Sequence, residues 1–171
     1  MSRTTVKAID FINRQTRDLA EYDNSWGSAA FVWSVLSDTY LLDGPSGWVH
    51  NPQKVWDLYK NRSVPEGIRA VLMMTFDHAY VSRQDRMRAA KDIDLFVRAT
   101  RTDDNADWAN HWPAIANVFR ELPDDIQAVG FHHTSTAADP WLGDWDDETN
   151  TYVMDWSKPW DVYAELFKAG N

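Results

Sequence analysis

The spacing of apolar residues changes along the chain, and this change constrains the fold more than any other feature of the sequence. Over most of the first 120 residues, apolar side chains recur every three or four positions, the period of a helix with one buried face. Between residues 141 and 156 they alternate, as in a β-strand. Both periods in separate segments predict an α+β fold. At 171 residues, 44% of them hydrophobic, the chain suits a single compact domain, residues 1–171.

Turn-forming residues divide the helical part into about five or six helices. The first is expected to be capped by Thr4 or Thr5 and to bury Val6, Ile9 and Leu19 on one face. Runs containing proline, glycine, asparagine and aspartate separate it from the next ones. The other expected helices cover residues 29–40, 52–59, 82–97, 111–122 and 157–167.

A small mixed sheet is expected between these helices. The apolar run from Ile68 to Tyr80 predicts a buried strand, although the same run also fits a helix. Residues 64–71 and 122–129 share the pattern [Val/Leu]-Pro-[Glu/Asp]-x-Ile-[Arg/Gln]-Ala-Val, so both are expected to lead into a strand. This match suggests an internal α-β repeat over 52–80 and 111–136, duplicated or converged on one turn chemistry. If the two strands are neighbours, a right-handed crossover with parallel pairing is expected.

Charge is distributed unevenly. Residues 1–101 hold 14 Lys and Arg against 12 Asp and Glu, whereas residues 102–171 hold 3 against 14. The formal net charge of −9 therefore belongs to the last 70 residues. A polyanion repels such a surface, which argues against direct binding of nucleic acid and favours a basic protein as the partner. A solvated surface that only keeps the protein soluble is the other interpretation.

The composition excludes further classes. Without cysteine there is no disulfide framework, no thiolate metal site and no cysteine nucleophile. No secretion signal is expected at the N-terminus, and the apolar runs are far shorter than the ~20 residues that span a bilayer. The sequence therefore predicts a cytoplasmic protein that does not enter a membrane. Glycine-rich phosphate loops and His-Glu-x-x-His are absent as well, so no cofactor and no metal ion are expected.

The C-terminal third combines tryptophans with carboxylates around a predicted hairpin over residues 141–156. Tryptophan anchors many binding interfaces, and a rim of carboxylates steers a basic partner. The leading hypothesis is a non-catalytic inhibitor, of the anti-defence or toxin-immunity type, that occupies a basic, nucleic-acid-binding site on another protein. The alternatives are that the tryptophans form the core, or that they build an assembly interface in a virion or scaffold. The candidate partner-binding residues are Asp139, Trp141, Asp144, Trp145, Asp146, Asp147, Glu148, Asp155 and Trp156.

A second hypothesis places an enzyme or ligand site where the two expected strands end. Asp77 and His78 close the first, and His132, His133 and Thr134 close the second. Side chains on adjacent strands lie close together, and histidine with carboxylate suits general acid–base or metal chemistry. Neighbouring residues of a strand point to opposite faces, so at most one of the two consecutive histidines joins a given site.

His132-x-Thr134 resembles one half of the signature of two-histidine phosphoesterases, in which two His-x-Thr/Ser motifs flank the scissile phosphate. The resemblance implies phosphoester chemistry at these two side chains. The other half of the signature is missing, because His78 is followed by Ala79 and Tyr80.

Overall fold

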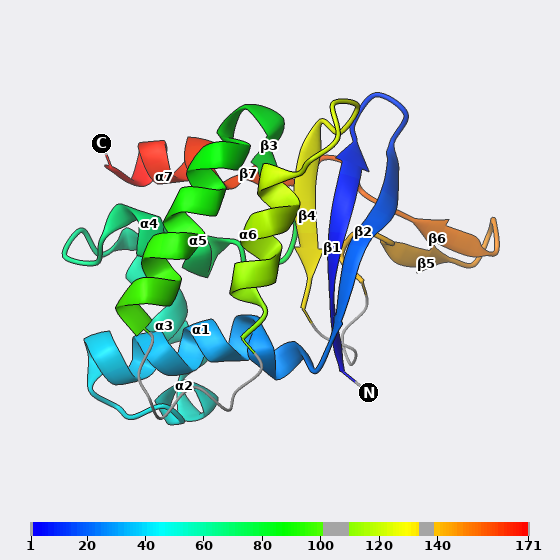
Figure 1. The fold of residues 1–171 in the computed structure, drawn as a ribbon. Coiled ribbons are helices and arrows are strands. Elements are labelled where there is room, and N and C mark those ends of the chain that lie inside the picture. The colour runs from blue at the N-terminus through cyan, green and yellow to red at the C-terminus, as the bar shows by residue number, and fades with distance from the viewer. Residues whose placement is uncertain (1, 101–109, 134–138, 171) are drawn as a thin grey trace.

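A five-stranded sheet with helices packed on one face forms the body of the protein (Figure 1). The computed structural model describes residues 2–100, 110–133 and 139–170. The strand order is β2-β1-β4-β3-β7, and β5 with β6 forms a separate hairpin. In the described residues the strands are β1 (Arg3–Asp10), β2 (Gln15–Asp23), β3 (Ala79–Ser82), β4 (Ala128–His132), β5 (Asp144–Asp146), β6 (Thr151–Val153) and β7 (Trp160–Asp161).

Seven α-helices occur in the described part of the chain, slightly more than the five or six expected. They are α1 (Ala29–Leu36), α2 (Gly47–His50), α3 (Pro52–Trp56), α4 (Glu66–Met73), α5 (Arg86–Thr100), α6 (Trp112–Arg120) and α7 (Val162–Gly170). Short 3-10 turns cover 25–27, 57–60 and 83–85, and a π-turn, Ser37–Leu41, extends α1. The prediction of a single α+β domain with a small mixed sheet and a C-terminal hairpin is confirmed.

The helices build the main core against the sheet. The almost completely buried aromatic rings there pack edge to face or tilted against one another; they are Phe96 of α5, Trp112 and Phe119 of α6 and Phe131 of β4. Proline 113 stands at the start of α6, where its missing N–H costs nothing. No helix among the residues described has the length and apolar character needed to cross a bilayer.

Residues 3–23 form an antiparallel hairpin, so the predicted N-terminal helix is wrong. In β1, Val6 and Ala8 face the main core, whereas Ile9 belongs to a second cluster on the other side of the sheet. Because β1 lies inside the sheet with both faces covered, its apolar residues do not alternate, and the strand period is lost from the sequence. The β-branched residues Thr4, Thr5 and Val6 favour the extended backbone.

The predicted strand from Ile68 to Tyr80 is also wrong over most of its length. Its first part is α4, and only Ala79–Ser82 pairs in the sheet as β3. The apolar run is continuous because α4 is buried on nearly all sides. β3 and β4 are neighbours, but they pair antiparallel, with Tyr80 opposite Gly130. The parallel crossover is therefore wrong, and the matched segments 64–71 and 122–129 adopt different structures.

A tryptophan covers the face of the sheet opposite the helices. Trp141 lies over Gly130 of β4, with its indole N–H donating to the carbonyl of Phe131 at 3.0 Å. A Cβ atom at position 130 would lie 2.5 Å from the Trp141 ring and 2.8 Å from Ile9. Glycine is thus required at this position for the ring to reach the sheet. Trp141, Ile9 and Ala128, with Phe11, Tyr80, Met154 and Trp156 packed against them, form this outer core.

Replacing Gly130 by alanine is expected to lower the free energy of unfolding by about 2–3 kcal/mol, since the ring and Ile9 must move. Urea denaturation measures the loss. In the double variant G130A/W141A the methyl group meets no ring, so its loss should be smaller than the sum of the two single losses. Additive losses would contradict the direct contact.

Candidate functional site

The predicted acidic surface is centred on a hairpin that projects from the body, well away from the helices (Figure 1). We call residues 144–153, comprising β5, β6 and the turn between them, the acidic hairpin. Trp145 and Tyr152 are paired across it at 5.1 Å between ring centroids, and about half of each side chain is exposed. Asp147 and Glu148 are exposed at the turn. An aromatic pair flanked by carboxylates is thus open to a partner.

Gly143 separates this exposed pair from the buried Trp141. Its φ of +88° turns the chain, and a Cβ there would lie 2.2 Å from the carbonyl oxygen of Val153. Trp141 consequently faces the sheet while Trp145 faces solvent, although the two residues lie only a few positions apart in the sequence. For Trp141, which is 3% exposed, the core interpretation is correct.

Several of the other candidate carboxylates hold the backbone in place. Asp146 accepts from the Thr149 hydroxyl and the Glu148 N–H, and these bonds lower the pKa of Asp146. Asp155 accepts from the hydroxyl and N–H of Ser157, which lowers the pKa of Asp155 in the same way. Trp156 packs against Phe11 rather than standing free.

Asp139 belongs to a partly buried ion pair on the outer face of the sheet. It accepts from Lys7 Nζ at 2.9 Å, and Lys7 also contacts Asp18 at 2.8 Å. Burial opposes the charge on Lys7, but the two carboxylates outweigh it and raise the pKa of the ammonium. Of the nine candidate partner-binding residues, Asp144, Trp145, Asp147 and Glu148 therefore remain the most available on the acidic hairpin.

The strand-end histidines lie on opposite faces of the sheet, as alternation predicts. His132 Nδ1 lies 3.9 Å from Asp139 on the outer face. His133 turns to the helical side, stacks on Phe131 and donates from Nε2 to the carbonyl of Met74 at 3.0 Å. The two rings therefore do not form one site.

Asp77 and His78 lie just before β3, and antiparallel pairing brings them to the edge at which β4 ends. The backbone of His78 has a positive φ of +60°. The His78 ring packs against Trp141, with 6.2 Å between the ring centroids, so it lies on the outer face of the sheet. Asp77 instead lines a cavity together with His133. Within the described residues, no three histidines or carboxylates are grouped to hold a metal ion. Thr134 lies outside the described residues.

Sequence reasoning missed a second site, which we call the tryptophan cleft. It consists of a cavity of about 420 Å³ and an adjoining one of about 240 Å³ that share Trp33, Thr75 and Asp77. Its four indole rings contact one another in a row. The distances between ring centroids are 5.8 Å for Trp26 and Trp48, 5.1 Å for Trp48 and Trp33, and 5.9 Å for Trp33 and Trp56. The only sequence signal was that four of the ten tryptophans fall within residues 26–56. The other lining residues are Ser2, Ser25, Ala29, Ala30, Phe76 and His133.

The stability of the protein is expected to fall between pH 6.5 and 4 because of His133. Burial lowers the pKa of His133 to about 4, so the folded state holds a neutral ring that the unfolded chain protonates first. The loss from this residue is up to about 3 kcal/mol, fully developed below the folded pKa. Urea denaturation of H133F at pH 7 and 4.5 should show a weaker pH dependence than wild type. The exposed His50→Gln variant is the control, and equal slopes for H133F and wild type would contradict this account.

Comparison of the sequence with protein-family models and with curated proteins, and comparison with solved structures, finds no match. The geometry of the acidic hairpin and of the tryptophan cleft is therefore the basis for the functional conclusions.

Proposed function

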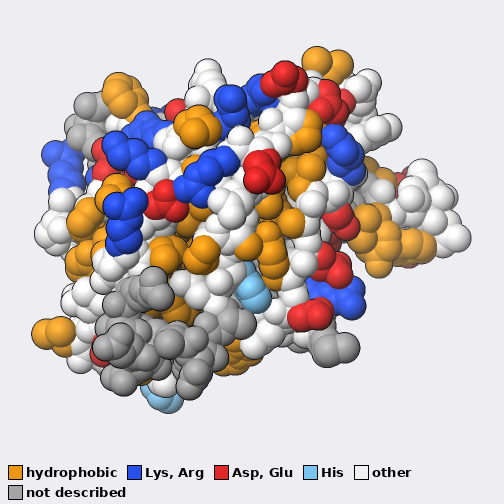
Figure 2. Space-filling model, viewed as in Figure 1, with side chains coloured by type: hydrophobic (Ala, Val, Ile, Leu, Met, Phe, Trp, Pro, Cys, Tyr) orange, Lys and Arg blue, Asp and Glu red, His pale blue; other side chains and the backbone are white. Residues whose placement is uncertain are grey.

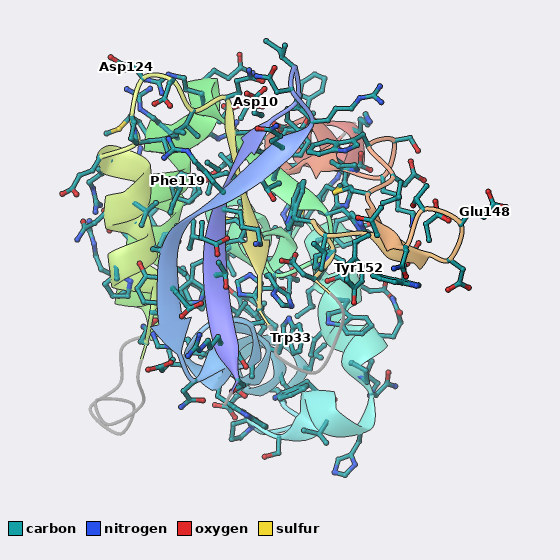
Figure 3. The ribbon with its side chains drawn as sticks, turned by 90° about the vertical axis from the view of Figure 1, so that its right-hand side faces the viewer. Asp10, Trp33, Phe119, Asp124, Glu148 and Tyr152 are labelled. Atoms are coloured by element: carbon teal, nitrogen blue, oxygen red, sulfur yellow. The ribbon has the colours of Figure 1, made fainter. Side chains whose placement is uncertain are left out.

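We propose that this protein is a non-catalytic inhibitor that binds a basic site on a partner protein through the acidic hairpin. The observation that carries the proposal is the exposed pair of Trp145 and Tyr152 between carboxylates on a projecting element. Figure 3 shows Tyr152 and Glu148 on this element. Large aromatic side chains of this kind provide most of the binding energy in many interfaces. An isolated two-stranded hairpin gains little stability of its own, and it has no core in which to bury large apolar side chains. Its two aromatic rings therefore stay exposed, and an exposed apolar patch of this kind is typical of a surface that contacts another molecule.

Charge on the hairpin supports a basic partner. Residues 139–157 hold six carboxylates and no Lys or Arg, and the only cation paired to the hairpin in the described structure is Lys158, at 3.5 Å from Asp144. Lysine and arginine side chains gather instead over the helical layer (Figure 2). The negative charge of the hairpin and the positive charge over the helical layer orient the molecule as it approaches a basic surface. Carboxylates seated in a groove that normally holds phosphates would exclude the nucleic acid, which is how binding becomes inhibition.

Two variants test this proposal by capture of a basic protein from host lysate at low and high salt. Changing Asp147 and Glu148 to their amides should weaken capture about tenfold and reduce its dependence on salt, since two steering charges are lost. Changing Trp145 and Tyr152 to alanine should abolish capture at either salt concentration. The matched control D38N/E121Q removes two exposed charges outside the hairpin and should capture like wild type.

Thermal unfolding curves show whether each variant is folded. Capture of no basic protein at low salt, or equal capture by the hairpin variants and the control, would overturn the proposal.

A further inference from the structure

The tryptophan cleft lies apart from the acidic hairpin and has the composition of a cation-binding site. In Figure 3, Trp33 lies just below the lower tip of β4, far from Glu148 at the outer end of the hairpin. We infer that the cleft binds a small organic cation with an alkylated ammonium group, held between indole faces and neutralised by Asp77.

Hydrogen bonds fix two of the indole rings, those of Trp33 and Trp48, before any ligand arrives. Trp33 Nε1 donates to the Thr75 hydroxyl at 2.9 Å, and Thr75 in turn donates to the carbonyl of Leu72 at 2.6 Å. Trp48 Nε1 donates to the Ser34 hydroxyl at 2.9 Å. With their N–H groups satisfied within the protein, the rings of Trp33 and Trp48 line the cavity in fixed positions. Fixing them in advance reduces the entropy lost on binding.

The charge of the cleft selects the sign of the ligand. Asp77 lines both cavities, and its carboxylate forms no hydrogen bond or ion pair with the residues the structure describes. No lysine or arginine lines either cavity among those residues. Indole faces attract cations through their quadrupole, most strongly for tryptophan and for ammonium groups too alkylated to keep a full hydration shell. The walls and Asp77 thus favour the same ligand class.

Size and access fit a small molecule. The larger cavity, at about 420 Å³, lies within the range of small-ligand sites. Trp26 is half exposed, so one wall of the cleft is reachable from solvent. Ala29 and Ala30 present no large side chains where they line the cavity. The cleft is therefore open enough for a single compact cation.

Choline and its neutral carbon isostere, 3,3-dimethyl-1-butanol, test the inference because they differ essentially in charge. Calorimetry on the full chain should show choline binding in the millimolar range or tighter, with the isostere at least about tenfold weaker. The indole N–H signals of Trp26, Trp33 and Trp48 should shift in NMR spectra on addition of choline. Glucose should not bind.

Asp77→Asn should weaken choline binding about tenfold while leaving the fold intact, because the side chain is exposed. Trp48→Leu should weaken it further by removing one aromatic wall. The controls D38N and W145L, outside the cleft, should bind choline like wild type. No choline binding, equal binding of the isostere or of glucose, or an unchanged affinity in D77N would each overturn the inference.

Discussion

The contact between Trp141 and Gly130 organises the side of the protein on which the acidic hairpin stands. Because Gly130 lacks a side chain, the Trp141 ring reaches the sheet and its N–H bonds to β4. Asp139 fixes the approach, because its carboxylate accepts from the backbone N–H of Trp141 at 2.9 Å and also pairs with Lys7 of β1. The chain then leaves the sheet at Gly143, and β5 and β6 project outward. Packing of one ring thus determines where the exposed aromatic pair is presented.

The same packing separates structural residues from available ones. Trp141, Asp139 and Trp156 hold the chain against the outer face, and Asp146 and Asp155 close turns. A sequence rich in tryptophan and aspartate therefore contains both a small core and a surface. Their separation depends on the positive φ at Gly143, which alternation alone does not predict.

Sequence periodicity predicted several of the helices, whereas β4, which is buried on both faces, was expected from the turn pattern of residues 122–129. The helices near 29–40, 52–59 and 111–122, the strand after Ile126 and the C-terminal hairpin are all present. Periodicity failed for β1, which is buried on both faces, and for α4, which is buried on nearly all sides. In both elements the apolar residues follow neither the helix period nor the strand period.

The candidate sites were predictable to different degrees. Alternation correctly placed His132 and His133 on opposite faces, because it depends only on strand geometry. The tryptophan cleft was not predictable, because its walls come from a 3-10 turn, three helices and the segment before β3, which only the tertiary structure assembles. The acidic hairpin and the tryptophan cleft are two distinct surfaces, for which we propose a basic protein and a small cation as the respective ligands.

The most direct test of the central claim is hydrogen exchange of the chain alone and bound to its captured partner. The account predicts that amides of residues 144–153 exchange readily in the free protein and become protected in the complex, while the sheet amides of β1 and β4 change little. Protection confined to the helical layer or to the tryptophan cleft, with the acidic hairpin unchanged, would contradict it.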